Sequence, residues 1–377
     1  MNRERLAATF TTLCAISSPS RKEGQICNYL QQLFAELGAD LIYEDNSATH
    51  TESDCGNLII RFNGNKPEGE GFFLACHMDT VGPCDNVKVV RTGDIFTSDG
   101  KTILGGDDKS GIAAIIEMIQ TLQEENLQHP TIEIIITTCE EIGLLGAKHL
   151  EYEKLESRYG YALDSSGINQ VVIGAPAANR FAIDINGRAA HAGLCPEKGI
   201  NSLTVATRAL SRVQLGRLDE ESTSNIGLIQ GGTATNIVPS QLTLKGEVRS
   251  HNPAKLATYT EKIFIAFQQT AQEFREELGE ELPVISFALH DDYPALRLDP
   301  GSAVVSRVQK AGEKTGTPLS FIQGGGGSDA NIFFGYGLPT AIISTGMDKV
   351  HTVEEQLDLA DLTQLTELIL ALATTNN

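Results

Sequence analysis

The chain is short of basic side chains: 29 lysines and arginines stand against 49 aspartates and glutamates, and its 377 residues carry a formal net charge of −20. No basic stripe could follow a phosphate backbone, so we expect no nucleic-acid partner. Anionic lipid would repel an acidic surface, and no apolar run approaches the length that crosses a bilayer. The composition therefore argues against nucleic-acid binding and against membrane attachment.

The seven cysteines are scattered and form no paired spacing. Disulfide frameworks and zinc ribbons depend on such pairs, so we interpret these residues as reduced thiols. The N-terminal stretch MNRERLAATFTTLCAISS lacks the apolar segment and cleavage site of a secretory signal and is typical of an amphipathic helix instead. We expect a cytoplasmic protein.

Two patterns of strands and helices follow one another along the chain, and its length also suggests two domains. In the first pattern, short apolar strands alternate with helices, as in an α/β sheet with a largely parallel centre. These strands are expected at 57–62, 72–76, 132–138, 160–164 and 340–344, and the helices at 3–17, 22–37, 110–125, 144–151, 302–315 and 354–373.

The second pattern begins after Gly174, where the strand at 180–186 alternates polar and apolar residues as a half-exposed strand does. Further strands are expected at 228–229, 242–248 and 283–289, and helices at 200–213 and 254–276. The sequence thus predicts an α/β catalytic domain with a mixed, largely parallel sheet at 1–173 and 291–377. A smaller α+β domain is inserted at 174–290.

The stretch TIEIIITTCEEIGLLG, residues 131–146, places two carboxylates directly after a β-branched apolar run. Such pairs most often lie at solvated helix starts. Beside a buried strand, however, two acids are unfavourable unless a cation binds them. Because adjacent positions point in different directions, one of Glu140 and Glu141 could bind a metal while the other faces a water molecule.

Four other motifs place metal-binding side chains next to predicted strands or helices. Taken singly, each has an ordinary interpretation as a surface turn or a helix N-cap. Together they offer oxygen and nitrogen ligands for two divalent ions without a thiolate, at the carboxyl ends of strands where α/β sheets form their functional crevice. The side chains are His77 with Asp79, Asp107 or Asp108, Asp164, and His351.

The chain carries, in this order, the motifs ACHMDTV, GGDDKSG, TTCEEIGLLGA, YALDSSG, AHAGLCPEKGINS, GGTATNIVP, GEVRS, GGGGSDAN and VHTVEE. Together they resemble the dinuclear zinc peptidase family that includes peptidase T, carboxypeptidase G, dipeptidases and aminoacylases. Through GGDDKSG and EEIGLLGA the chain resembles peptidase T and its relatives most of all. The resemblance extends over nearly the whole sequence.

This resemblance implies a role for each matching residue. Two divalent ions are expected, zinc first, with cobalt or manganese as alternatives. Asp107, rather than Asp108, would bridge them and precede a cis peptide bond, and Glu140 would be the general base. Asp79 would support His77. The metal ligands would be His77, Asp107, Glu141, Asp164 and His351.

In the inserted domain the resemblance points to three substrate-binding residues, His191, Asn236 and Arg249. The histidine would help to hold the oxyanion, often from a partner subunit, and arginine suits a substrate carboxylate because its donors form a fork. The resemblance also implies a homodimer formed through this domain. The glycine run at 324–327 lacks the Gly-Lys-Ser/Thr ending of a P-loop, so we interpret it as a close backbone approach near the site.

Three functions remain open at this point. The leading hypothesis is an aminopeptidase that cuts short peptides, as a tripeptidase does. The second is the same chemistry on another amide, namely an N-acyl amino acid, a dipeptide or a C-terminal residue; Arg249 would bind a carboxylate in either case. The third is a metal-binding protein without catalysis, which the complete set of acidic and basic groups argues against.

Overall fold

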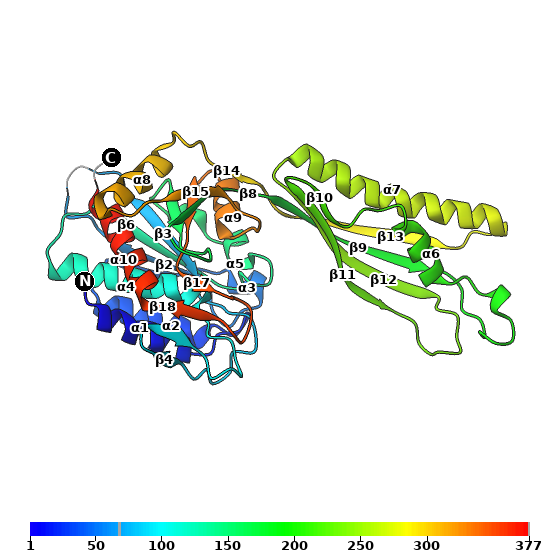
Figure 1. Ribbon diagram of the computed structural model, residues 1–377, viewed down its shortest axis with the longest axis horizontal. Coiled ribbons are helices and arrows are strands. Elements are labelled where there is room, and N and C mark those ends of the chain that lie inside the picture. The colour runs from blue at the N-terminus through cyan, green and yellow to red at the C-terminus, as the bar shows by residue number, and fades with distance from the viewer. Residues whose placement is uncertain (67–68, 376–377) are drawn as a thin grey trace. The chain divides into compact units, whose positions relative to one another are not determined.

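A computed structural model describes residues 1–66 and 69–375. The chain divides into two compact units, Met1–Gly174 together with Leu296–Asn377, and Ala175–Ala295 (Figure 1). The second unit continues past residue 290 because its last strand runs to Tyr293. Each unit has its own sheet.

The sheet of the first unit is built around buried, mostly apolar strands. Within the described residues it has nine strands, and along it lie β1 (Leu41–Glu44), β2 (Leu58–Phe62), β6 (Ile132–Thr137), β3 (Phe72–His77), β7 (Gly160–Ala162), β16 (Thr340–Ile343), β8 (Gln170–Ala175) and β14 (Leu296–Arg297), with β15 (Ser320–Gln323) beside β8. The central strands β6, β3, β7 and β16 are mutually parallel. The antiparallel pairs are β1 with β2, β2 with β6 and β8 with β16, whereas β15 pairs parallel with β8. This is the expected mixed sheet with a largely parallel centre.

Helices pack around this sheet. They are α1 (Arg3–Ala15), α2 (Gly24–Glu36), α3 (Ala48–Thr51), α4 (Gly106–Glu124), α5 (Leu145–Lys148), α8 (Ala303–Thr315), α9 (Asp329–Gly335) and α10 (Leu359–Thr374), with one 3₁₀ turn at Tyr152–Lys154. Helix α4 contacts β3, α1 and α10, so almost all of its side chains are buried. A small antiparallel sheet joins β17 (Met347–Asp348), β18 (Gln356–Asp358), β5 (Ile95–Thr97) and β4 (Val90–Thr92).

The second unit is a five-stranded antiparallel sheet with two packed helices, which confirms the expected α+β class. Its strands lie in the order β10 (Gly216–Asp219), β11 (Ser222–Gly231), β12 (Gln241–Ser250), β9 (Ala177–Asn186) and β13 (Val284–Tyr293), and its helices are α6 (Ser202–Leu210) and α7 (Pro253–Leu278), with a 3₁₀ turn at Pro196–Lys198. Phe181, Ile183 and Ile185 pack into the core with both helices, and the alternate residues Arg180 and Asp184 point away from it. Successive side chains of a strand point to opposite faces of the sheet, which explains the alternation of polar and apolar residues along β9.

Three expected elements differ most from the structure in their bounds. The helix expected at 144–151 is only the four-residue α5, because Leu144 has a left-handed backbone with φ +59°. The helix expected from 354 begins at Leu359, since residues 356–358 form β18. The strand expected at 228–229 is the ten-residue β11. Its first half is polar and gave no apolar strand pattern in the sequence. In the described part of the chain, no helix is long and apolar enough to cross a membrane.

Candidate active site

Parallel strand ends bring the predicted ligands of the first unit to one edge of its sheet. Strand β3 ends at His77, β6 leads into Glu140 and Glu141, and β7 leads into Asp164. The pairings His77↔Thr137 and Ala75↔Ala162 place these three ends beside one another. The carboxyl edge of the parallel centre therefore carries the site.

Asp107 lies between two histidines. Its Oδ1 is 3.1 Å from Nε2 of His77, and its Oδ2 is 3.2 Å from Nε2 of His351. The same His351 nitrogen lies 3.1 Å from Oε1 of Glu141. Ligand atoms of His77, Asp107 and Glu141 all fall within 4.8 Å of one another. One carboxylate thus presents each of its oxygens to a different histidine, as a group bridging two ions would.

The carboxylate of Asp79 fixes the backbone of the acidic pair. It accepts hydrogen bonds from the N–H groups of Glu140 at 2.9 Å and Glu141 at 3.2 Å, and from the Ser20 hydroxyl at 2.7 Å. The Nδ1 atom of the His77 ring lies 2.9 Å from the main-chain oxygen of Asp79 and 3.5 Å from its Oδ1. Asp79 therefore orients the ring mainly through its carbonyl, and the acids through its carboxylate.

Charge at the site is unevenly shared among the acids. Desolvation raises the pKa values of Glu140 and Asp164 well above their usual range. Burial also acts to raise the pKa of Asp107, but hydrogen bonds with His351 and His77 outweigh it and hold that pKa below its usual value. In turn, Asp107 and Glu141 raise the pKa of His351 to about 10. Burial thus raises the pKa values of two of these acids, whereas contacts with histidines lower that of Asp107.

The donor set fits divalent cations. Besides the expected ligands, the site contains Asp329, whose carboxylate is 4% exposed and whose Oδ1 has no hydrogen-bond partner among the described residues. Asp329 lines a small cavity together with His77 and Asp164. So many carboxylates beside two histidines carry a surplus of negative charge that bound cations would neutralise. Oxygen and imidazole ligands without a thiolate suit zinc, cobalt or manganese.

Asp329 and Glu355 received no role from the sequence, although both lie inside quoted motifs. Asp329 accepts a 2.5 Å hydrogen bond from the hydroxyl of Thr137, at the end of β6. Glu355 accepts hydrogen bonds from three backbone N–H groups of the loop that carries Asp107. The sequence signal that could have identified these two residues is their position in the motifs GGGGSDAN and VHTVEE. The peptide bond between Asp107 and Asp108 is cis, as the resemblance implies.

In the second unit, His191 and Asn236 lie on adjacent loops. The Ala192 N–H donates to the carbonyl of Asn236 at 2.9 Å, and His191 forms a β-bridge with Ile237. The Nδ1 of His191 accepts hydrogen bonds from the N–H groups of the two residues at 193 and 194, both at 3.2 Å. The neutral ring therefore carries its proton on Nε2, in an exposed side chain that can donate to a ligand.

Arg249 is at the other end of the same sheet. The two loops leave from the end where Asn186 pairs with Gln241, whereas Arg249 pairs with Ala178. Gln241 and Arg249 are eight residues apart on β12, which at about 3.3 Å per residue corresponds to roughly 26 Å. The structure thus brings His191 and Asn236 together but leaves Arg249 far from both within this unit. Its guanidinium is paired with Glu247, to whose Oε2 Nη2 donates at 3.1 Å.

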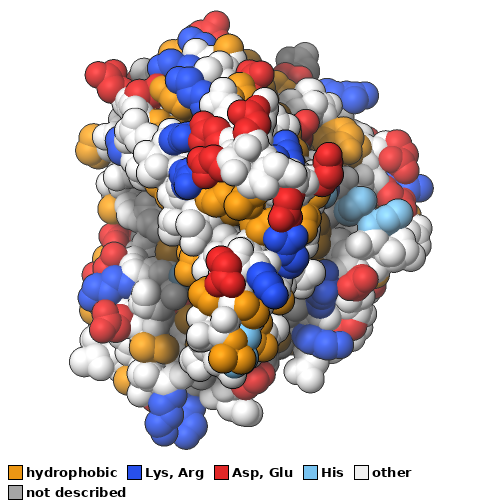
Figure 2. All heavy atoms as spheres, turned by 90° about the vertical axis from the view of Figure 1, so that its right-hand side faces the viewer, with side chains coloured by type: hydrophobic (Ala, Val, Ile, Leu, Met, Phe, Trp, Pro, Cys, Tyr) orange, Lys and Arg blue, Asp and Glu red, His pale blue; other side chains and the backbone are white. Residues whose placement is uncertain are grey.

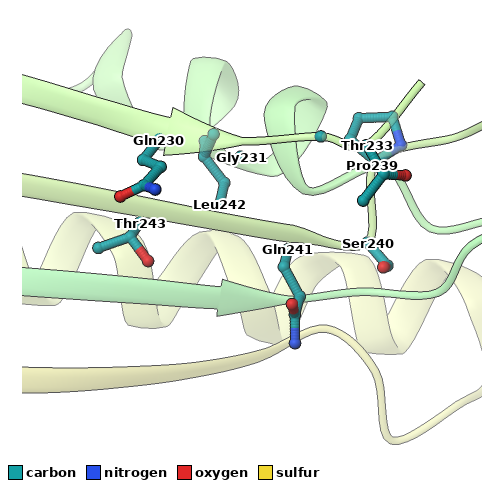
Figure 3. Close-up of a pocket in the computed structure, with 9 residues that line it drawn as sticks. Gln230, Gly231, Thr233, Pro239, Ser240, Gln241, Leu242 and Thr243 are labelled. Carbon is teal, nitrogen blue, oxygen red and sulfur yellow. The ribbon is translucent and has the colours of Figure 1, made fainter. Parts of the chain in front are cut away.

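A pocket of about 450 Å³ lies between the ends of β11 and β12 in the second unit. Figure 3 shows the side chains of Gln230, Gln241 and Thr243 around it. Its lining includes Gly231 and Gly232, the first residues of the GGTATNIVP motif. None of the predicted catalytic or metal-binding residues is among those that line this pocket.

The chain is similar to known proteins over nearly its whole length. The aminopeptidase PepT of Bacillus cereus ATCC 10987 has 38% sequence identity and a TM-score of 0.89, over 99% of this chain and 98% of that one. A tripeptidase of Staphylococcus aureus subsp. aureus Mu50 has 35% identity and a TM-score of 0.93 over the same shares. The YqjE protein of Bacillus subtilis strain 168 is 39% identical over 373 residues, or 99% of this chain and 98% of that protein.

The sequence pattern of one enzyme family extends over most of the chain. Residues 73–375 match the peptidase family M20/M25/M40, and this range includes every predicted catalytic and metal-binding residue. The chain belongs to peptidase family M20/M25/M40 and is a metallopeptidase.

Proposed function

We propose that this enzyme is an aminopeptidase that releases the N-terminal residue of short peptides, tripeptides above all, and works with two divalent ions, zinc foremost. The observation that carries the proposal is Asp107, whose two oxygens face two different histidines beside an acidic pair. The likeness to an aminopeptidase and a tripeptidase, each covering 99% of this chain, supports the substrate class.

The ligands divide into two sets around Asp107. His351 and Glu141, which lie 3.1 Å apart, would hold one ion, and His77 with Asp164, which line one small cavity, would hold the other. When bound there, the ions would polarise the scissile carbonyl and lower the pKa of water so that it can attack at neutral pH.

Glu140 is suited to move the proton. Its raised pKa favours uptake of a proton from the attacking water, and the same carboxyl can then deliver that proton to the leaving amine. Asp79 holds the backbone of this residue through the Glu140 N–H, so the carboxylate starts from a fixed position.

The second unit would supply the groups that bind the peptide. His191 would donate from Nε2 to the carbonyl oxygen as negative charge develops there, with Asn236 on the adjacent loop. Arg249 would bind the carboxylate of a short peptide through its fork of donors. Because roughly 26 Å of strand separates Arg249 from the two loops, we assign them to different subunits at any one active site.

A homodimer through the second unit follows from that assignment. Exposed large hydrophobic side chains support it: among the described residues, ten of fifteen belong to this unit, including Leu228 and Ile229 at 64% exposure each. The space-filling view in Figure 2 shows hydrophobic side chains exposed between charged ones on one face of the molecule. All seven cysteines are free and six are buried, which suits the reducing cytoplasm in which we place the enzyme.

A mass-spectrometric screen tests the proposal. Zinc-loaded protein would be incubated separately with free dipeptides, free tripeptides, N-acetylated tripeptides and N-acyl amino acids. We expect loss of the N-terminal residue from free tripeptides, and no reaction of the acetylated ones. Cleavage of blocked substrates alone would replace the aminopeptidase with a deacylase or carboxypeptidase of the same metal chemistry. Silence on every substrate would favour a metal-binding protein without catalysis.

A further inference from the structure

Glu355 is a buried acid that lies beside the proposed metal site without belonging to its ligands. Its side chain is 1% exposed. Oε2 accepts hydrogen bonds from the N–H groups of Leu104 and Gly105, both at 2.8 Å, and Oε1 accepts one from the N–H of Asp107 at 3.1 Å. One carboxylate thereby takes up three donors of a single loop.

That loop needs such a partner. It leads into α4, and the first N–H groups of a helix have no acceptor within the helix. Asp107 and Asp108 also have non-helical backbone angles, so the ordinary helical hydrogen bonds cannot hold them. A carboxylate at this position satisfies the donors and is favoured by the helix dipole. Unlike a local N-cap, this one comes from a residue about 250 positions further along the chain.

The two glycines of the loop make room for the contact. Gly105 has φ +79°, a conformation that other residues adopt only with strain. At Gly106 the backbone angles are ordinary, but a Cβ atom would lie 3.1 Å from Oε1 of Glu355. The second glycine is therefore needed for the close approach of the glutamate rather than for the turn.

Glu355 is firmly held from its own side. It directly precedes β18, which pairs with β5, and its N–H donates to the carbonyl of Thr352 at 3.1 Å. Thr352 belongs to the same turn as His351, whose ring contacts Asp107. The glutamate thus joins the backbone of one proposed ligand to the segment that carries another.

We propose that Glu355 is a positioning residue that holds Asp107 and His351 in the arrangement two divalent ions require. The inference rests on the proposed two-metal site and adds the group that keeps it assembled when metal is absent. Loss of this carboxylate should weaken metal binding more than it weakens the fold, because the loop it fastens carries the one carboxylate shared by both ions.

The test compares Glu355→Gln with a matched control, Glu133→Gln. Glu133 is also buried, and its carboxylate accepts hydrogen bonds from the N–H groups of Glu156 at 3.1 Å and Ser157 at 2.6 Å. It lies near the start of β6, at the end of that strand opposite to the acidic pair. Zinc affinity of the full chain would be measured by competition with a chelator, together with the absorption spectrum of the cobalt-loaded protein and the melting temperature of the metal-free protein.

We expect both variants to melt at lower temperature than wild type, and Glu355→Gln alone to lose zinc affinity, by about 10–100-fold, as is usual for groups that orient metal ligands. Its cobalt spectrum should also change. If Glu355→Gln does not fold, two other variants replace it. Glu355→Asp shortens the side chain by one methylene group, and Gly106→Ala places a methyl group against the Glu355 carboxylate.

Unchanged zinc affinity in the folded variants, with wild type binding two ions, would overturn this inference and leave the proposed function intact. Equal losses of affinity in Glu355→Gln and Glu133→Gln would overturn it too, since the effect would then be general destabilisation. Wild type that binds no divalent ion would instead refute the metal site itself, and the inference with it.

Discussion

At the scale of single residues, the chemistry depends on how two adjacent glutamates are held. The N–H groups of Glu140 and Glu141 both donate to the carboxylate of Asp79, so one side chain holds the turn after β6. Oε1 of Glu141 lies 3.1 Å from Nε2 of His351. We therefore propose different tasks for these two neighbouring glutamates, Glu141 as a metal ligand and Glu140 as the proton carrier.

Glu140→Gln should separate these tasks. The amide cannot take a proton from water, whereas the ligands are untouched, so the variant should keep its metal and lose about 10²–10⁴-fold in kcat. Steady-state kinetics on a free tripeptide and elemental analysis of the same sample would measure both quantities. Full activity with normal metal content would contradict the assignment of Glu140.

Asp107→Asn should have the opposite result. An amide has one ligand oxygen where the bridging carboxylate has two, so at least one ion should be lost. Elemental analysis after gel filtration would measure the metal bound per chain. Asp99→Asn, at an exposed surface aspartate, is the control and should bind metal as wild type does. Equal metal content in the two variants would show that Asp107 is not the bridge.

Asp329 makes stability depend on pH when metal is absent. Burial raises its pKa to about 6, above the value of the unfolded chain. As pH falls through 6 toward 4, the folded protein binds the proton first, so its unfolding free energy rises; above pH 6 the buried charge is unfavourable. Asp329→Asn should therefore be more stable than wild type at pH 8, by up to about 3 kcal/mol.

That gain should shrink at pH 4–5. Urea unfolding of chelator-treated protein at the two pH values would measure it. A difference between variant and wild type that is the same at both pH values would mean that the effect comes from packing rather than from the charge of Asp329.

At the scale of elements, the close packing of α4 against the sheet limits which residues the helix can contain. A Cβ atom on Gly111 would lie 2.6 Å from Sγ of Cys76, 2.8 Å from Oδ1 of Asp108 and 2.9 Å from Cβ of Leu163. The first and last of these belong to β3 and to the end of β7. The helix can deliver Asp107 to the strand ends only because this glycine lets it approach.

Gly111→Ala tests this packing. In an exposed helix the change would stabilise the chain by up to about 1 kcal/mol. Here we expect a loss of about 1–3 kcal/mol, because the methyl group overpacks the contact. Chemical denaturation would give the sign. A stabilised Gly111→Ala variant would mean that the helix lies further from the sheet than the structure has it.

Features of the fold and of the site could be predicted from the sequence where they depend on local patterns, and not where they depend on contacts between distant residues. The buried strands β3 and β6 were expected because short apolar runs, β-branched in β6, are a local signal, and their ends located His77 and the acidic pair. The two-residue strand β17 and the three-residue strand β18 have no such signal. The roles of Asp329 and Glu355 arise from contacts with residues about 190 and 250 positions away, which no local pattern reveals.

At the scale of the whole molecule, the sheet of the second unit separates Arg249 from His191 and Asn236 by roughly 26 Å of strand. A short peptide cannot touch both ends of β12 in a single unit. If all three residues bind one substrate, two copies of the chain must contribute to each site. In that case, the oligomeric state would be part of the catalytic mechanism.

Mixed dimers test that conclusion. His191→Ala and Arg249→Ala should each be nearly inactive alone. After subunit exchange, about half of the dimers would be mixed, and one of the two sites in each would have both residues intact, so about a quarter of wild-type activity should return. If His191 and Arg249 acted in the same chain, no mixed dimer would contain an intact site and activity would stay low.

The proposed peptidase activity depends on two ions shared by Asp107, and a metal titration checks this requirement. Chelator-treated protein would be titrated with zinc while bound metal and hydrolysis of a free tripeptide are followed together. We predict two ions per chain and activity that returns as they bind. Full hydrolysis by metal-free protein, or metal binding at two equivalents without hydrolysis of any amide, would contradict the account.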